Sequence, residues 1–378
     1  MSTTTAPAPD AAAPTPEDPG TSVRRSVIGA NLLLTFLALV LALLIGAVLI
    51  AATSPEVIDA VKGGTFSDVL RAIWESVSSA YSALLQGATI DVKALQNGNI
   101  AKAFYPLSET LTVSAPLILA GLAVAVPFRA GLFNIGVQGQ MTLGAIGGGY
   151  IGFAIAMPSG LHLLASVVFA MLFGAFWAWI AGVLKARSGA HEVITTIMLN
   201  WIAIYLLSYV LTLEFFKRPG RDDPISPLLD DSAIYPRLFP GTNLRVHLGF
   251  IVALLVVAFI WWLLNRTVLG FRLETAGANP AAARTAGINV GRAWVIAMAL
   301  AGALSGLAVT MNVNGTDGVV TAGVVGDVGF DAITVALLGR ASPIGTLFAG
   351  LLFGGLKAGG LAMQAATGTP IDIVLVLQ

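Results

Sequence analysis

Long apolar segments recur along the chain, and short stretches that hold most of the charged residues separate them. A helix needs about 20 mostly apolar residues to cross the hydrocarbon core of a membrane, so each longer segment predicts one membrane-spanning helix. The first segment covers 27–52, and the others lie near 110–128, 132–156, 161–184, 193–213, 247–264, 293–312, 322–338, 345–362 and 370–378. The pattern predicts an all-α, polytopic transmembrane bundle of about ten helices. The last segment is the shortest, so we expect its helix to be truncated.

The polar stretches around the first apolar segment differ from each other. Residues 1–26 are rich in Pro, Ala and Thr and contain no apolar run, which predicts a disordered cytoplasmic tail. Farther along, Phe66, Leu70 and Trp74 belong to a helical repeat of apolar residues with polar residues between them. This repeat predicts an amphipathic helix that lies at the outer membrane surface or packs on the bundle as a lid. The predicted domains are the tail 1–26, a first transmembrane helix 27–52, an extracytoplasmic segment 53–109 and a transmembrane core 110–378.

Composition agrees with a membrane protein. The chain is 56% hydrophobic and 11% charged, with a mean hydropathy of +0.85, whereas soluble domains carry about 25% charged residues. So few charges could not cover the surface of a soluble fold of this length, but in lipid apolar side chains can face outward. The 20 basic and 20 acidic residues balance, which argues against binding of nucleic acid because that requires a basic face.

Charge placement predicts the orientation. If the N-terminus is cytoplasmic and each segment crosses once, the short basic connections all lie inside, as the positive-inside rule requires. The basic residues of that side are Arg24, Arg25, Arg129, Lys185, Arg187, Arg266, Arg272, Arg284, Arg292 and Arg340. The short outer connections near 157–160, 313–321 and 363–369 contain no Lys or Arg. We therefore expect a multi-pass protein of the cell membrane with a cytoplasmic N-terminus.

The chain lacks the common signatures of catalysis. It has no G-x-x-x-x-G-K-[ST] phosphate loop, no G-x-S-x-G elbow and no H-E-x-x-H pair. It has no cysteine, and His162, His191 and His247 lie far apart without metal-ligand spacing. We therefore predict no catalytic residue, no metal site and no cofactor, and a transport role without an ATPase site of its own.

Ionisable residues inside the predicted spans are rare. Lys357 is the clearest case, and Glu192, Asp331 and Asp372 lie near segment ends. A charge at mid-membrane costs about 3 kcal/mol or more, so such residues tend to have a role. Lys357 either lines a pathway or snorkels to a helix end. An ion-coupled carrier usually contains more intramembrane acids, which places the energy source in a separate subunit.

A polar, glycine-rich stretch covers 131–145. Asn134, Gln138 and Gln140 are uncharged and lie beside Gly136 and Gly139. Glycines permit a broken helix, which membranes tolerate where it lines a cavity, and amides can exchange hydrogen bonds with a hydroxylated solute. We predict that these residues line a translocation pathway. The alternative is that the amides only bridge helices, as polar residues in membranes often do.

The longest predicted cytoplasmic loop, 265–293, contains a short helix. Asn279 can cap it, Pro280 suits its first position and Gly287 can end it. Its small side chains suit docking into a groove on another protein, and the alternative is an ordinary connector. The residues predicted to couple the chain to a partner are Gly277, Ala278, Asn279, Pro280, Ala282, Ala283, Arg284 and Gly287.

Four segments together resemble a known family. "ETAGANPAAARTAGI" is similar to the coupling-helix signature of ABC-importer permeases for branched-chain amino acids, simple sugars and nucleosides. The runs at 108–145, which contains F-N-I-G-x-x-G-Q, at 191–203 and at 329–350 resemble the nucleoside branch. Asn200 lies in the second of these runs and is assigned with the amides to the pathway.

The resemblance implies the permease subunit of an ATP-driven importer, with nucleosides as the expected cargo. It implies ATPase subunits, a second permease subunit and an extracytoplasmic substrate-binding protein as partners. Rigid-body alternating access, driven through 278–287, is the expected mechanism. A simple sugar permease and a self-contained secondary carrier are the alternatives.

Overall fold

The computed structural model describes Leu37 and residues 40–377, and the regular secondary structure of these residues is helical. They form no β-strand, and two isolated β-bridges join Ile225 to Thr321 and Arg237 to His247. The predicted tail 1–26 and most of the first half of the predicted helix 27–52 lie outside this part of the chain. Contacts divide the described residues into two compact units, one that contains 40–77 and 372–377 and one that contains 78–371.

The first unit contains apolar helices and the start of an amphipathic one. A helix over Val40–Thr53 is followed by α2 (Pro55–Gly63), and the two are bent by 64°. α3 (Phe66–Ala88) begins in this unit, and α16 (Asp372–Leu377) belongs to it. The amphipathic helix expected from the sequence is present as α3, with Phe66 and Trp74 exposed.

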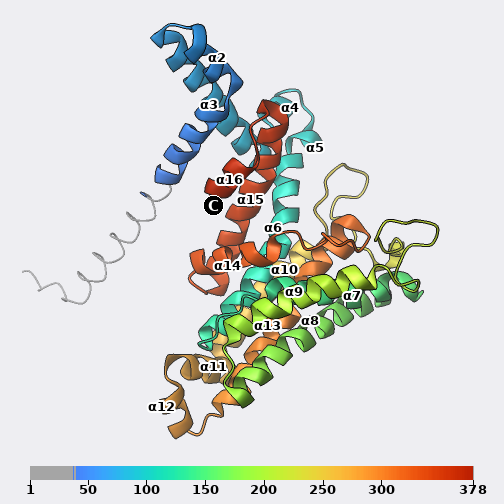
Figure 1. Cartoon of the computed structure of the whole chain (residues 1–378). Helices are drawn as coiled ribbons and strands as arrows, with labels where there is room; N and C mark the ends of the chain where they lie inside the picture. The colour runs from blue at the N-terminus through green and yellow to red at the C-terminus, as the bar shows by residue number, and fades with distance from the viewer. Residues whose placement is uncertain (1–36, 38–39, 378) are drawn as a thin grey trace, which may run out of the picture. The chain divides into compact units, whose positions relative to one another are not determined.

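The second unit is a bundle of long helices joined by short ones (Figure 1). Its elements are α4 (Val92–Gln96), α5 (Ile100–Ala103), α6 (Tyr105–Arg129), α7 (Val137–Ala154), α8 (Leu161–Ser188), α9 (Glu192–Val210), η1 (Asp231–Ala233), α10 (Leu248–Arg266), α11 (Val268–Ala278), α12 (Pro280–Thr285), α13 (Val290–Asn312), η2 (Val313–Asp317), α14 (Val328–Leu338) and α15 (Pro343–Thr367). The last turns of α3 also belong to it, because Gly359 of α15 packs against the backbone of Leu84.

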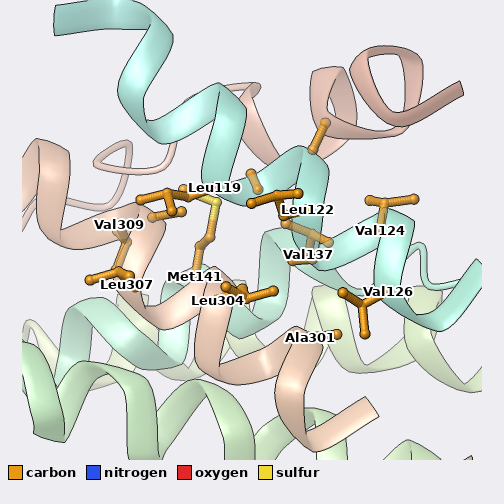
Figure 2. Packing of buried hydrophobic residues seen from close by; sticks show 14 of the residues in the cluster. Leu119, Leu122, Val124, Val126, Val137, Met141, Ala301, Leu304, Leu307 and Val309 are labelled. Carbon is orange, nitrogen blue, oxygen red and sulfur yellow. The ribbon is translucent and has the colours of Figure 1, made fainter. Parts of the chain in front are cut away.

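The core of this unit forms where α6, α7 and α13 meet. Leu119, Met141 and Leu304 come from these three helices and pack together (Figure 2). α6 is the most enclosed, with 83% of its most apolar 18-residue window buried, against 22% for α9. The exposed side chains of the outer helices are large and apolar, including Phe176 and Trp201. Such a surface requires lipid around it.

Glycines let the central helices approach one another closely. A Cβ added at Gly302 of α13 would lie 2.1 Å from the carbonyl oxygen of Gly174 in α8, and one at Gly306 would lie 2.1 Å from that of Ala170. No larger residue fits at either position, so α13 and α8 are in backbone contact. This is the close packing that small residues permit between membrane helices.

The structure does not confirm about ten transmembrane helices. Six helices of the described part are long and apolar enough to cross a membrane, or seven if the bent pair counts as one span. The segments predicted at 132–156, 322–338 and 370–378 become α7, α14 and α16. α7 has 18 residues but includes two glutamines and several glycines. α14 has 11 residues, about 16 Å of helix, and the hydrocarbon core is about 30 Å thick.

Candidate functional site

Four amide side chains meet where α7 begins. Asn134 and Gln140 form a reciprocal pair, in which Asn134 Nδ2 donates to Gln140 Oε1 at 3.2 Å and Gln140 Nε2 donates to Asn134 Oδ1 at 2.9 Å. Asn134 also receives the backbone N–H of Gly136, and Gln140 Oε1 also receives the hydroxyl of Ser305 from α13. The pair therefore holds the non-helical turn before α7 against α13.

The other two amides reach across to neighbouring helices. Gln138 donates to the carbonyl of Gly326 and accepts from the N–H of Gly329, at the start of α14. Asn200 of α9 donates to the carbonyl of Ile135 and accepts from the N–H of Gly139, both at 2.8 Å. A Cβ at Gly139 would lie 3.0 Å from Asn200 Cα, so this contact favours glycine.

The structure thus brings together all six residues assigned to the pathway, which we call the amide cluster: Asn134, Gly136, Gln138, Gly139, Gln140 and Asn200. Its four amides are at most 8% exposed, and each uses both its oxygen and its nitrogen in hydrogen bonds within the protein. These contacts support the alternative that the amides bridge helices. That they also line a pathway remains a prediction.

A different set of polar residues faces an open volume. A cavity of about 200 Å³ lies among α6, α13, η2, α14, α15 and the loop before α10. We call it the polar cavity, and its lining residues are Glu109, Thr112, Val113, Pro116, Leu117, Arg245, Asn312, Thr316, Val328 and Lys357. One water needs only about 10–15 Å³ of such volume, so this cavity can hold a small solute or several waters.

Every charged group that lines the polar cavity is paired. Arg245 Nη1 lies 3.0 Å from Glu109 Oε2, and Lys357 Nζ of α15 donates to Asp331 Oδ2 of α14. The side chains of Lys357 and Asp331 are 23% and 16% exposed, so this pair is largely removed from solvent. The paired charges cancel, which makes the cavity polar without a net charge.

The backbone is interrupted on two sides of the polar cavity. Pro116 lies inside α6 and has no N–H to donate to the carbonyl of Thr112, one turn earlier. α13 continues into the π-helical turn η2, which carries Thr316. Irregular backbone is tolerated at membrane depth only where it is buried in protein or lines a cavity, and π-turns occur often at functional sites.

The predicted coupling helix is present as α12, and local signals explain both of its ends. Asn279 Oδ1 accepts from the N–H groups of Ala281 and Ala282, and Pro280 occupies the first position. Beyond the helix, Gly287 has φ +79° and the N–H of Ile288 bonds to the carbonyl of Ala283. This is a Schellman motif, which requires a left-handed residue that glycine provides without strain.

Not every predicted coupling residue is on the exposed side of α12. Ala278, Asn279, Ala282, Arg284 and Gly287 are exposed, and Gly277 and Pro280 are partly buried. Ala283 is fully buried and packs in the chain's own core. The exposed face of α12 can meet a partner, but Ala283 cannot take part in that contact.

The helix before α12 packs on the turn that precedes the amide cluster. A Cβ at Gly277 of α11 would lie 2.3 Å from the carbonyl oxygen of Arg129, so no side chain fits there. Arg129 pairs with Glu274 of α11 at 3.2 Å and donates to the carbonyl of Ala341. Trp294 donates its indole N–H to the carbonyl of Ala130. Movement of α11 and α12 would therefore act directly on the end of α6.

The comparisons with known proteins agree with this arrangement. The model of the family "branched-chain amino acid transport system / permease component" matches residues 107–377. The chain belongs to this permease family.

Individual relatives match over most of the chain. The permease is 36% identical over 307 residues to the guanosine ABC transporter permease protein NupP of Bacillus subtilis, covering 79% of this chain and 82% of the relative. It is 36% identical to the glucose ABC transporter permease protein TsgB13 of Haloferax volcanii over 72% of this chain and 74% of that one. The nucleoside ABC transporter permease protein NupB of Lactococcus lactis is also 36% identical, over 65% and 69% of the two chains. No solved structure matches.

The resemblance seen in the sequence is therefore confirmed. This chain is a multi-pass permease subunit of an ABC importer, which is a transport component. The sequence singled out Lys357 but missed most of the polar cavity, including Glu109, Arg245, Asn312 and Thr316. The one local signal of the polar cavity in the sequence was Pro116 within an apolar segment, because a proline inside a helix leaves one backbone carbonyl without its hydrogen-bond donor.

Proposed function

We propose that this permease imports nucleosides, and that ATP hydrolysis in separate ATPase subunits drives the transport. The observation that carries the proposal is 36% identity, over most of the chain, to a guanosine and to a nucleoside permease. The helical bundle provides the pathway, and the ATPase subunits provide the energy that a chain without a phosphate loop needs.

A simple sugar is the second candidate cargo, because a glucose permease is equally identical. Nucleosides and glucose share a hydroxylated ring, and they differ in charge and shape from branched-chain amino acids. A secondary carrier is no longer an alternative, because the family is that of ABC permease components.

Uptake by cells tests the cargo. Cells in which the gene is deleted should lose uptake of labelled guanosine and uridine at low concentration and keep uptake of labelled glucose. A plasmid copy of the gene should restore uptake of guanosine and uridine. Lost glucose uptake with normal nucleoside uptake would replace the nucleoside proposal by the sugar proposal.

We further propose that α12 docks onto the ATPase subunits through its exposed face. Asn279, Ala282 and Arg284 offer one hydrogen-bonding group, one small side chain and one positive charge on that face. The remaining partners are a second permease subunit and an extracytoplasmic binding protein that delivers the solute. Because α11 holds Arg129 and packs on Gly131, docking at α12 can switch the bundle by rigid-body motion.

The proposed docking fixes the orientation in the cell membrane, with α12 and the N-terminus in the cytoplasm. An enzyme reporter that works only in the cytoplasm should be active when it is fused after Arg187 or Arg284. A reporter that works only outside the cytoplasm should be active when it is fused at Asp230. A cytoplasmic Asp230 would contradict this orientation and with it the docking of α12.

A further inference from the structure

The polar cavity is an open volume with charged and polar lining residues inside an apolar bundle. Lys357 is the least expected of its residues, because a charged side chain within a membrane helix is costly and usually functional. A lysine with a purely structural role needs only its partner, Asp331. Lys357 has that partner and still lines the cavity.

Several lining groups keep hydrogen-bonding capacity for a solute. An ammonium has three N–H donors, and the structure shows one of those of Lys357 bonded to Asp331. Asn312 donates to the carbonyl of Val324, which leaves its side-chain oxygen without a partner among the described residues. The hydroxyl of Thr112 donates to the carbonyl of Ser108, so its lone pairs remain to accept.

The lining also limits what kind of solute fits. No net charge faces the cavity, so a solute with an uncompensated charge would enter unpaired, which is unfavourable away from water. Among the described residues that line it, none is aromatic, so nothing there stacks on a nucleobase. The lining also has an apolar part, which consists of Val113, Pro116, Leu117 and Val328.

We propose that the polar cavity binds the hydroxylated ring of the transported solute, through Lys357, Asn312, Thr112 and Thr316, and discriminates the rest of the solute weakly. Ring hydroxyls both donate and accept, which matches a lining of ammonium, amide oxygen and hydroxyl groups. The inference rests on the proposed function and deepens it: the permease recognises the sugar part of a nucleoside, and the base passes with little selection.

The absence of cysteine from the chain makes a direct test possible. A single Thr316→Cys variant, assembled with its partners in lipid vesicles, is treated with a water-soluble methanethiosulfonate, and the mass of this chain reports modification. The matched control is Thr196→Cys, because Thr196 is 1% exposed and lies against Gly136 in the amide cluster. Val113→Cys is the second cavity variant, in case the first does not assemble.

We expect both cavity cysteines to react and the control cysteine to stay unmodified. Uridine at ten times its dissociation constant should slow modification about tenfold. 2′,3′-Dideoxyuridine should need at least about ten times the concentration for the same protection, because hydrogen bonds to charged and polar groups are lost. Free uracil should not protect. Unreactive cavity cysteines, or equal protection by uracil and uridine, would overturn the inference.

The test separates this inference from the proposed function. If wild-type vesicles import uridine but uridine does not slow modification, the cavity is not the solute site and the function stands. If the wild type imports glucose and not uridine, the nucleoside function falls, and protection by glucose would still support a site for hydroxylated rings.

Discussion

The amide cluster and the polar cavity are both polar regions within an apolar bundle, yet they differ in what their polar atoms face. In the amide cluster, each amide oxygen and nitrogen is bonded to another part of the protein. In the polar cavity, the charges are paired but the same side chains border about 200 Å³ of open volume. Asparagine occurs in both regions, so this residue type alone does not say which atoms are engaged and which face a cavity.

The difference has an energetic meaning. A buried polar group that loses its partner costs about 1–3 kcal/mol, so a fully bonded cluster resists change and holds helices in one arrangement. A group that faces a cavity can exchange water for solute at little cost. We therefore expect substitutions in the amide cluster to act on folding, and substitutions in the polar cavity to lower transport even where stability is retained or restored.

The largest effect on stability should come from breaking the charge pair of the cavity on one side. Lys357→Met leaves the Asp331 carboxylate without its partner, which should lower the free energy of unfolding by about 3 kcal/mol or more. The double variant Lys357→Met/Asp331→Leu should recover stability but not transport. Thermal unfolding and uridine uptake of both variants measure this. Full transport by the double variant would assign Lys357 a structural role only.

A somewhat smaller loss of stability is expected in the amide cluster. Asn134→Leu removes both bonds to Gln140 and the bond to Gly136, which should cost about 2–4 kcal/mol. The yield of folded complex and its thermal midpoint should both fall. A variant that folds like the wild type and has lost transport would show that the cluster lines the pathway after all, and would remove the contrast with the cavity.

A similar contrast, between a side chain buried in the chain's own core and one that is exposed, occurs within α12. Ala282→Trp places an indole on the exposed face, where overpacking against a partner should cost about 1–3 kcal/mol and weaken ATPase retention about tenfold. Ala283→Trp should instead damage the fold, because Ala283 is fully buried in this chain. Co-purification of the ATPase and thermal unfolding separate the two outcomes. Normal retention and uptake in the Ala282 variant would exclude α12 as the docking element.

The smallest effect on stability should come from Arg129 and Glu274, which are neither buried nor facing the cavity. Their side chains are 27% and 62% exposed, and exposed ion pairs contribute about 0–1 kcal/mol. Glu274→Gln should therefore leave the thermal midpoint nearly unchanged while raising the ATP hydrolysed per uridine transported, because α11 loses a link to α6. An unchanged ratio would show that this link does not transmit motion.

Local structure was predictable where one short stretch contains all the information. The caps of α12 lie within residues 279–288, so the sequence predicted the helix and both of its ends. α3 was predicted from its helical repeat. The number of spans was not predictable from apolar composition, because composition does not say where a helix breaks. The predicted span at 132–156 begins as a non-helical turn held by Asn134.

The candidate sites show the same limit. Which side of α12 is free could not be read from a run of alanines, and only packing distinguishes Ala282 from Ala283. The polar cavity joins residues far apart in the chain: Arg245 and Glu109 are separated by 136 positions and Lys357 and Asp331 by 26. No sequence pattern connects such pairs.

The sequence by itself determined that this protein lies in a lipid bilayer, to which family it belongs, and where short helices with complete capping signals form. Apolar area and local hydrogen bonds decide these properties, and both are set by neighbouring residues. Tertiary structure alone decided which polar residues are engaged and which face a cavity. That depends on whether a partner from a distant helix reaches the same atom, as Ser305 reaches Gln140 and as no described residue reaches the side-chain oxygen of Asn312.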